Sequence, residues 1–228
     1  MRLGGMQKLT LLDYPEKLAC TLFAAGCNYR CPFCHNASLV LRPEPALEAE
    51  EALAFLRRRR GVLQGVCLTG GEPLLQPDAE AFLRRIRELG YAVKLDTNGA
   101  LPDRLIAVVE AGLVDYVAMD VKNCPAAYGE TVGIDGYDTA PVDESIRYLL
   151  SGKVEYEFRT TVVRQLHSGQ RLRQLAEWIA GAGRYFLQSF LDSGDLIRPG
   201  LSGYDAAEME ALRETVAETL PCVRLRGV

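Results

Sequence analysis

Three cysteines in one short segment constrain this chain more than any other feature. Cys27, Cys31 and Cys34 have the spacing C-x₃-C-x₂-C and directly follow the apolar run Leu18–Ala25, which predicts a buried strand. Thiolates are soft, strongly donating ligands, and three of them on one loop can hold three irons of a cubane iron–sulfur cluster. The fourth iron is then free to bind another ligand, so the segment predicts a site for chemistry.

Zinc is the competing interpretation of this segment. Structural zinc sites have four ligands, and His35 adjoins Cys34, whereas adjacent residues rarely converge on one tetrahedral ion. The chain has no second C-x₂-C pair and no H-x₃₋₅-H pair. A disulfide framework fits poorly, because seven cysteines are an odd number and no signal peptide precedes them. The spacing favours the cluster and leaves zinc as the alternative.

Composition describes an ordinary globular protein. Of the 228 residues, 48% are hydrophobic and 25% are charged, which is enough to bury a sizeable core. The apolar runs are too short to span a membrane, and a net charge of −4 argues against a nucleic-acid partner. The run Arg57–Arg60 ends a predicted helix, where cations complement the helix dipole. Unpaired cysteines indicate a reducing compartment, so we expect a cytoplasmic protein.

Strand, loop and helix alternate about six times along the chain. A short edge strand is predicted at Leu9–Leu12, a helix after Pro43 and Pro45, and loops at Tyr128–Tyr137 and Asp192–Gly203. The main strands are predicted at Leu18–Ala24, Gly65–Thr69, Ala92–Asp96, Tyr116–Asp120, Tyr156–Val163, Arg184–Phe190 and Cys222–Leu225. The helices are predicted at Ala46–Arg59, Pro77–Leu89, Pro102–Ala111, Val142–Leu150, Gly169–Ala180 and Asp205–Thr219.

This alternation predicts an α/β fold with parallel strands and right-handed crossovers. The count indicates a partial (β/α)₆ TIM-like barrel of six strands, formed by a single domain over residues 1–228. The cysteines lie on a loop, residues 24–38, after the first barrel strand. Three further motifs end the next strands: Gly70-Gly71-Glu72-Pro73, Asp96-Thr97-Asn98-Gly99 and Met119-Asp120-Val121-Lys122. Because parallel α/β folds carry their active sites at the carboxyl ends of strands, we expect all four motifs to meet there.

Each motif also has a plain structural interpretation. Two glycines and a proline are common at turns, and Asp96 before Asn98-Gly99 is typical of a turn start. Asp96 and Asp120 end neighbouring strands, so they are expected to face each other with a cation or hydrogen-bond donors between them. Lys122 and His167 are interpreted as surface residues. The cysteines outside the triad are expected to be buried thiols or bystanders, and they are Cys20, Cys67, Cys124 and Cys222.

The cysteine loop resembles the signature of radical S-adenosylmethionine (SAM) enzymes. The longer stretch from Leu9-Thr10-Leu11-Leu12-Asp13-Tyr14-Pro15-Glu16-Lys17 to Cys31-Pro32-Phe33-Cys34-His35-Asn36 is similar to glycyl-radical-enzyme activases, and within them to activating proteins of anaerobic ribonucleoside-triphosphate reductase. The resemblance implies a 4Fe-4S cluster on the three cysteines, with SAM chelating the fourth iron through its amino and carboxylate groups. It also implies an electron donor such as flavodoxin or ferredoxin.

The resemblance assigns further residues to SAM. It implies that the Gly70-Gly71-Glu72 backbone meets the SAM amino group and that Phe33 lies near adenine, while His35 supplies backbone contacts. Residues bordering the SAM carboxylate, where a monovalent cation is also expected, are Asp96, Thr97, Asn98, Met119 and Asp120. Arg159 either approaches the substrate or pairs with a neighbouring strand.

The resemblance predicts that the 5′-deoxyadenosyl radical from SAM takes a hydrogen atom from a glycine Cα of a partner enzyme. A second hypothesis is a radical SAM enzyme acting on a small molecule, similar to 7-carboxy-7-deazaguanine synthase. A third is a zinc-binding interaction module. No cysteine-rich insert follows Asn36 and no cysteine-rich tail is present, which favours the first hypothesis.

Overall fold

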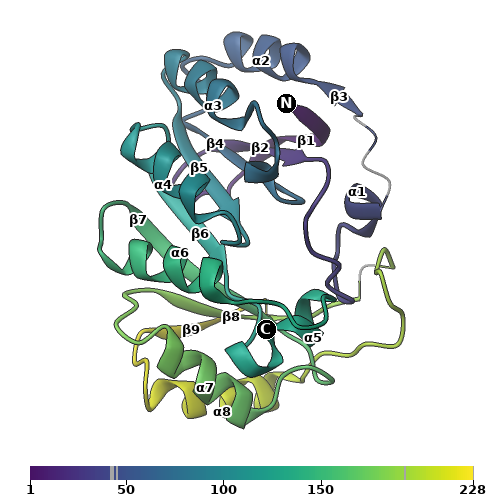
Figure 1. The fold of residues 1–228 in the computed structure, drawn as a ribbon. Helices are drawn as coiled ribbons and strands as arrows, with labels where there is room; N and C mark the ends of the chain where they lie inside the picture. Colours follow the sequence, from purple (N-terminus) through teal and green to yellow (C-terminus); the bar gives the residue numbers. More distant parts are fainter. Residues whose placement is uncertain (42–43, 45, 193, 228) are drawn as a thin grey trace.

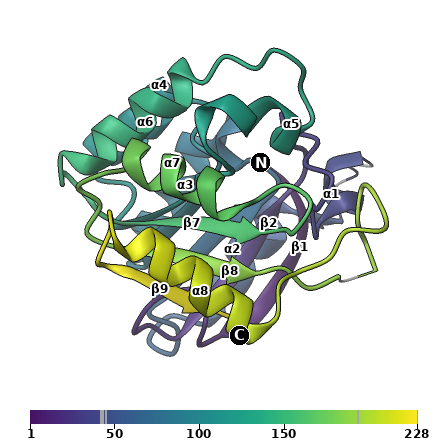
Figure 2. The ribbon, with the colours of Figure 1, turned by 90° about the horizontal axis from the view of Figure 1, so that it is seen from below.

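One curved β-sheet, with helices packed on its outer face, forms the framework of the chain (Figures 1 and 2). The computed structural model describes residues 1–41, 44, 46–192 and 194–227. Within these ranges the strand order is β3-β1-β2-β4-β5-β6-β7-β8-β9. The strands are β1 Arg2–Thr10, β2 Ala19–Ala24, β3 Leu47–Glu48, β4 Gly65–Gly70, β5 Ala92–Thr97, β6 Tyr116–Asp120, β7 Glu155–Val162, β8 Tyr185–Ser189 and β9 Val223–Arg226.

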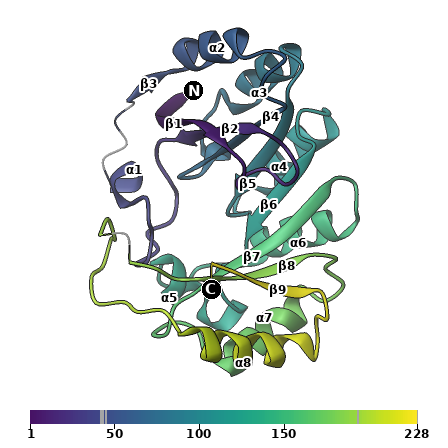
Figure 3. The same cartoon turned by 180° about the vertical axis from the view of Figure 1, so that it is seen from behind.

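The helices connect successive parallel strands. They are α1 Ala37–Leu41, α2 Ala49–Arg58, α3 Ala79–Glu88, α4 Pro102–Glu110, α5 Tyr128–Val132, α6 Ala140–Leu150, α7 Gly169–Trp178 and α8 Ala206–Ala217. From β2 through β4 to β9, each neighbouring pair in the sheet is parallel, as predicted for a partial TIM-like barrel. Strand β9 adds a seventh parallel strand to the six of the predicted barrel. Seen from behind in Figure 3, the sheet curves from β1 and β2 to β8 and β9.

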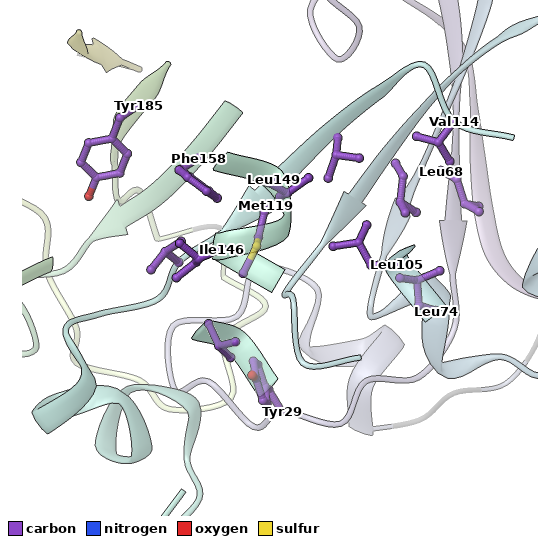
Figure 4. Packing of buried hydrophobic residues seen from close by; sticks show 14 of the residues in the cluster. Tyr29, Leu68, Leu74, Leu105, Val114, Met119, Ile146, Leu149, Phe158 and Tyr185 are labelled. Atoms are coloured by element: carbon purple, nitrogen blue, oxygen red, sulfur yellow. The ribbon is translucent and has the colours of Figure 1, made fainter. Parts of the chain in front are cut away.

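Alternation along the strands separates an apolar outer face from a polar inner face. On the outer face, Met119 of β6 and Phe158 of β7 lie beside Ile146 and Leu149 of α6 (Figure 4). All four side chains are at most 1% exposed, and burial of each such side chain contributes about 1.5–3 kcal/mol. The inner face carries charged residues, which belong to the site described below.

The N-terminal strand differs from its prediction. Instead of a short edge strand at Leu9–Leu12, β1 spans Arg2–Thr10 and pairs antiparallel with both β2 and β3. Its sequence contains two glycines and little alternation, so the strand depends on pairing with neighbours rather than on local propensity. It ends at Thr10, whose hydroxyl accepts hydrogen bonds from the backbone N–H groups of Leu12 and Asp13, each at 3.2 Å.

Two helix predictions also need correction. The helix predicted at Ala46–Arg59 begins at Ala49, as α2, because Leu47–Glu48 pairs with β1 as β3; Pro43 and Pro45 lie outside the described residues. The predicted loop Tyr128–Tyr137 begins with helix α5, whose Tyr128 and Val132 are fully buried. Tertiary packing therefore outweighs the glycine content of this stretch.

The arginine run at the end of α2 lies where the sequence predicted it. Arg57 and Arg58 lie in the exposed last turn of α2, consistent with a solvated helix terminus. Among the described residues, no helix combines the length and the apolar character needed to cross a bilayer.

Candidate active site at the carboxyl ends of the strands

One cavity brings the four sequence motifs together at the carboxyl ends of β2, β4, β5 and β6. Residues from every motif contribute to its wall, although the motifs are separated by up to about a hundred residues in the chain. The predicted site residues that line it are Cys27, Cys31, Phe33, Cys34, His35, Gly70, Gly71, Asp96, Thr97, Asn98 and Asp120. Three predicted residues, Glu72, Met119 and Arg159, do not line this cavity, and their positions are described separately below.

The three cysteines face this cavity as free thiols. Burial raises the pKa of Cys31 to about 12 and raises those of Cys27 and Cys34, while the Lys122 ammonium opposes the shift at all three. Binding a metal therefore has to release protons from these thiols. Among the described residues, no three His, Cys, Asp or Glu side chains already lie close enough together to hold a single metal ion.

Backbone packing explains the two glycines at the end of β4, Gly70 and Gly71. The Gly71 N–H donates to Ala24 O at 2.9 Å, and a Cβ on Gly71 would lie 1.9 Å from Gly26 O. Gly70 has a φ of +112°, and its Cβ would lie 2.5 Å from Ala24 N. The glycines thus let the start of the cysteine loop pack directly on the end of β4.

Glu72 ties β4 to β5 underneath the cavity. Its carboxylate is fully buried and accepts hydrogen bonds from the Thr97 hydroxyl at 3.0 Å and from the Asn98 N–H at 2.7 Å. Burial dominates its titration and raises its pKa to about 7, although these donors favour the ionised form. Glu72 acts here as a brace between two strand ends.

A charged network occupies the inner face of β5, β6 and β7. Arg159 of β7 donates from Nη1 to Asp96 at 3.1 Å and from Nε to Asp120 at 2.8 Å. Lys94 pairs with Asp96 and is itself 2% exposed, while Lys122 donates to Asp120 at 2.9 Å. The two aspartates therefore face each other across an arginine, which corresponds to the ion-pair alternative for Arg159.

Protein cations already neutralise these carboxylates. Burial alone would raise the pKa of Asp96 and Asp120, but Arg159 and the two lysines outweigh it and hold both pKa values below the usual range. The donors expected between the aspartates are thus Arg159, Lys94 and Lys122. The monovalent cation stays a prediction, and it is not needed to balance the charge.

Met119 and Lys122 lie in places that differ from their sequence interpretation. Met119 is fully buried on the outer face, with its side chain packed towards Gly99, so any contact with SAM would come from its main chain. Lys122 is not a surface lysine but lines the cavity. Its position two residues after Asp120 places both side chains on one face of an extended segment, and this spacing was the signal that the sequence offered.

His167 is another missed residue, since it is 1% exposed rather than on the surface. Its Nδ1 accepts from the Val163 N–H at 3.0 Å, so Nε2 carries the proton and donates to Lys122 O at 2.8 Å. Burial lowers its pKa. The His167 ring lies edge-on to the Phe33 ring, with 6.5 Å between the ring centroids. The histidine therefore holds the segment that carries Lys122, and no sequence pattern indicated this role.

Three of the four cysteines outside the triad are buried, as expected. Cys20 and Cys67 are fully buried and Cys124 is 1% exposed, while the Cys222 thiol donates to Ala182 O at 3.1 Å. Cys67 lies on the inner face, where its thiol is 3.7 Å from Asp96 Oδ1. Within the described residues all seven cysteines are free thiols.

Comparison with known proteins places this site in a family. The model of the radical SAM superfamily matches residues 21–179, which include all four motifs. The chain is 32% identical over 194 residues to the "Putative glycyl-radical enzyme activating enzyme" of Methanocaldococcus jannaschii, covering 82% of this chain and 79% of that protein. It is 35% identical over 119 residues to the 7-carboxy-7-deazaguanine synthase of Methanopyrus kandleri, covering 43% of this chain and 46% of that enzyme.

A solved structure supports the fold. Streptococcus suis SuiB bound to SAM superposes with a TM-score of 0.70 at 16% identity, covering 90% of this chain and 48% of SuiB. The fold, the cysteine loop and the family match agree, and an interaction module built on zinc is the wrong interpretation of the triad. The chain belongs to the radical SAM superfamily, whose enzymes use a 4Fe-4S cluster and SAM.

Proposed function

We propose that this enzyme is an activase that generates a glycyl radical on a partner enzyme. The observation that carries the proposal is the 32% identity to a protein named as a glycyl-radical enzyme activating enzyme, because the match covers about four fifths of both chains. A shared cysteine loop alone would support only the superfamily.

The residues present fit the two cofactors of the family. Three thiols on one loop face a cavity that, within the described residues, no fourth cysteine lines, so a cubane cluster held there would have protein ligands on three irons and one iron left for SAM. When bound, the reduced cluster would give one electron to the sulfonium of SAM, which would yield methionine and a 5′-deoxyadenosyl radical able to take a hydrogen atom from a glycine Cα. The protein's part is to hold SAM beside the triad: Lys122 offers a cation to its carboxylate, and Asp96 and Asp120 offer acceptors.

Anaerobic ribonucleoside-triphosphate reductase is the proposed partner, and flavodoxin or ferredoxin the proposed electron donor. The similarity of Leu9–Lys17 and of the Cys-His-Asn ending of the cysteine loop to activases of that reductase supports this choice. Free thiols and an oxygen-sensitive cluster suit a reducing compartment, which supports a cytoplasmic location. We also retain the prediction of a single domain over residues 1–228.

A small-molecule radical SAM reaction is the second candidate. The 35% identity to a 7-carboxy-7-deazaguanine synthase favours it, but that match covers less than half of either chain. The two candidates differ in what they need for turnover. A small-molecule enzyme consumes SAM productively without a protein partner, whereas an activase needs the partner as its substrate.

The test is anaerobic reconstitution with iron and sulfide, followed by reaction with SAM, a reductant and the purified reductase. We expect about four irons and four sulfides per chain and a glycyl-radical doublet in the electron paramagnetic resonance (EPR) spectrum only when the reductase is present. SAM cleavage with no doublet on the reductase would reject this partner. Productive turnover of a small-molecule substrate without any protein would favour the second candidate.

A further inference from the structure

We propose that Asn98 sets the reduction potential of the cluster by donating a hydrogen bond to the sulfur of Cys27. This inference rests on the family's cluster and not on the identity of the partner enzyme. The sequence placed Asn98 only among residues near SAM. The structure instead points its side-chain amide at a cluster ligand.

Contacts on both ends of the side chain fix the amide orientation. The backbone N–H of Ala100 donates to Asn98 Oδ1 at 3.0 Å, so the atom on that side is the oxygen and the NH₂ group faces the other way. Nδ2 lies 2.8 Å from Asn28 Oδ1 and 3.8 Å from Cys27 Sγ. Its two hydrogens can serve these two acceptors at once, and the residue is only 5% exposed.

Asn98 distinguishes Cys27 from the other two ligands. The Cys27 sulfur also accepts from the Tyr29 N–H at 3.4 Å, so two N–H groups converge on it. In the part of the chain that the structure describes, no other side-chain N–H or O–H group donates to a sulfur of the triad. Of the three ligand sulfurs, that of Cys27 is therefore the one on which a side-chain N–H can stabilise the negative charge added by reduction of a bound cluster.

The sign of the effect follows from charge. Reduction adds an electron to the cluster and its thiolates, so an N–H···S bond stabilises the reduced form more than the oxidised form and raises the potential. A buried amide acts in a low dielectric, which strengthens the effect. Removing the donor makes the cluster harder to reduce.

Two substitutions of Asn98 distinguish the NH₂ group that donates to Cys27 Sγ from the Oδ1 atom that accepts from the Ala100 N–H. Asn98→Asp keeps an oxygen for the Ala100 N–H and removes the NH₂ group, at the cost of a negative charge. Asn98→Ala removes the donor without adding charge. The matched controls are Asn36→Asp and Asn36→Ala, because Asn36 lines the same cavity but its side-chain amide donates to Gly70 O at 3.4 Å, and only its backbone N–H, which both substitutions keep, reaches a sulfur of the triad.

The measurement is an EPR-monitored redox titration of the reconstituted cluster without SAM, after iron and sulfide analysis of each variant. We expect Asn98→Ala to lower the reduced-to-oxidised ratio at a given potential about tenfold, which corresponds to a midpoint about 59 mV lower for a one-electron couple. Asn98→Asp should shift it further. Asn36→Ala should match the wild type, and Asn36→Asp should shift the midpoint less than Asn98→Asp.

Three outcomes would overturn the proposal. The first is an Asn98→Ala midpoint equal to that of the wild type. The second is an equal shift in Asn36→Ala, which would reflect general disturbance of the cavity. The third is loss of cluster loading in both Asn98 variants while the Asn36 variants load normally, because Asn98 would then be needed for assembly rather than for the potential. None of these outcomes affects the proposed partner, which is tested by the glycyl doublet.

Discussion

The cysteine loop and the two carboxylates of the charged network, Asp96 and Asp120, line the same cavity, but the loop and the network find their partners in different ways. In the network, Asp96 and Asp120 each have at least two cationic partners from the protein, with Arg159 shared between them. In the loop, burial keeps the thiols protonated, so they lack the charge that a metal ligand needs. The protein therefore supplies the ion-pair partners of the carboxylates itself, whereas the thiols need an external metal group as their partner.

This contrast predicts that damage to the loop removes activity, whereas damage to the network removes stability. Replacing Cys31 by alanine should abolish SAM cleavage, because one iron loses its ligand. The free energy of unfolding of the metal-free protein should change far less. The measurements are 5′-deoxyadenosine formation under reductant and urea unfolding of the metal-free chain.

Cys222→Ala is the control for loss of a thiol, since Cys222 lies away from the cavity and bonds to Ala182 O. It should retain cluster content and SAM cleavage. A Cys31→Ala enzyme that still cleaved SAM would show that the ligand assignment is wrong.

Arg159→Met breaks the network at its centre and should have the largest effect on stability. The substitution leaves two part-buried carboxylates with one lysine each, and loss of the partner of a fully buried charge costs about 3–5 kcal/mol. Because the lysines remain, we expect about 3 kcal/mol in urea unfolding. Arg213→Met, which removes an exposed pair with Glu210, should cost less than about 1 kcal/mol. Equal losses in both variants would mean that the network adds no special stability.

Glu72 predicts a dependence of stability on pH. Its folded pKa of about 7 lies above the ordinary value of 4.5, so the folded chain binds the proton more tightly and this contribution to stability falls as the pH rises through that window. Glu72→Gln removes the titration. The advantage of the wild type over Glu72→Gln should therefore shrink by roughly 3 kcal/mol between about pH 5 and 8. Urea unfolding of the metal-free protein across this range checks it.

Glu80→Gln on the exposed face of α3 is the control for removing a carboxylate. A difference between wild type and Glu72→Gln that grew with pH would contradict the assigned direction of the pKa shift.

The sequence was informative where chemistry needs particular residues at short spacing, and uninformative where distant segments meet. Spacing predicted the triad, and the strand rhythm predicted which ends converge. It did not predict that Glu72 braces β5 or that His167 is buried against Lys122 O, because those contacts join residues 26 and 45 positions apart. Likewise, β1 is stabilised by pairing with β2 and β3, and α5 is stabilised by burial of Tyr128. Neither element was therefore visible as a local pattern of residues in the sequence.

A substitution of Tyr29 has the smallest expected effect, and it measures how much one hydrogen bond of the cysteine loop adds to the stability of the metal-free protein. Its hydroxyl hydrogen-bonds to the Tyr137 hydroxyl at 2.6 Å, and its ring is 1% exposed between the rings of Tyr128 and Tyr137. Tyr29→Phe keeps the ring and loses the hydrogen bond, so it should cost about 1 kcal/mol in urea unfolding of the metal-free protein. Cluster content after reconstitution should be unchanged, because the Tyr29 backbone N–H still reaches Cys27.

A matched variant, Tyr185→Phe, removes the buried hydrogen bond from the Tyr185 hydroxyl to the Thr160 hydroxyl at 2.8 Å. This bond lies far from the cysteine loop, and its loss should lower the free energy of unfolding by a similar amount. If Tyr29→Phe lost its cluster while Tyr185→Phe kept it, the loop would depend on this hydroxyl as well as on the cluster itself.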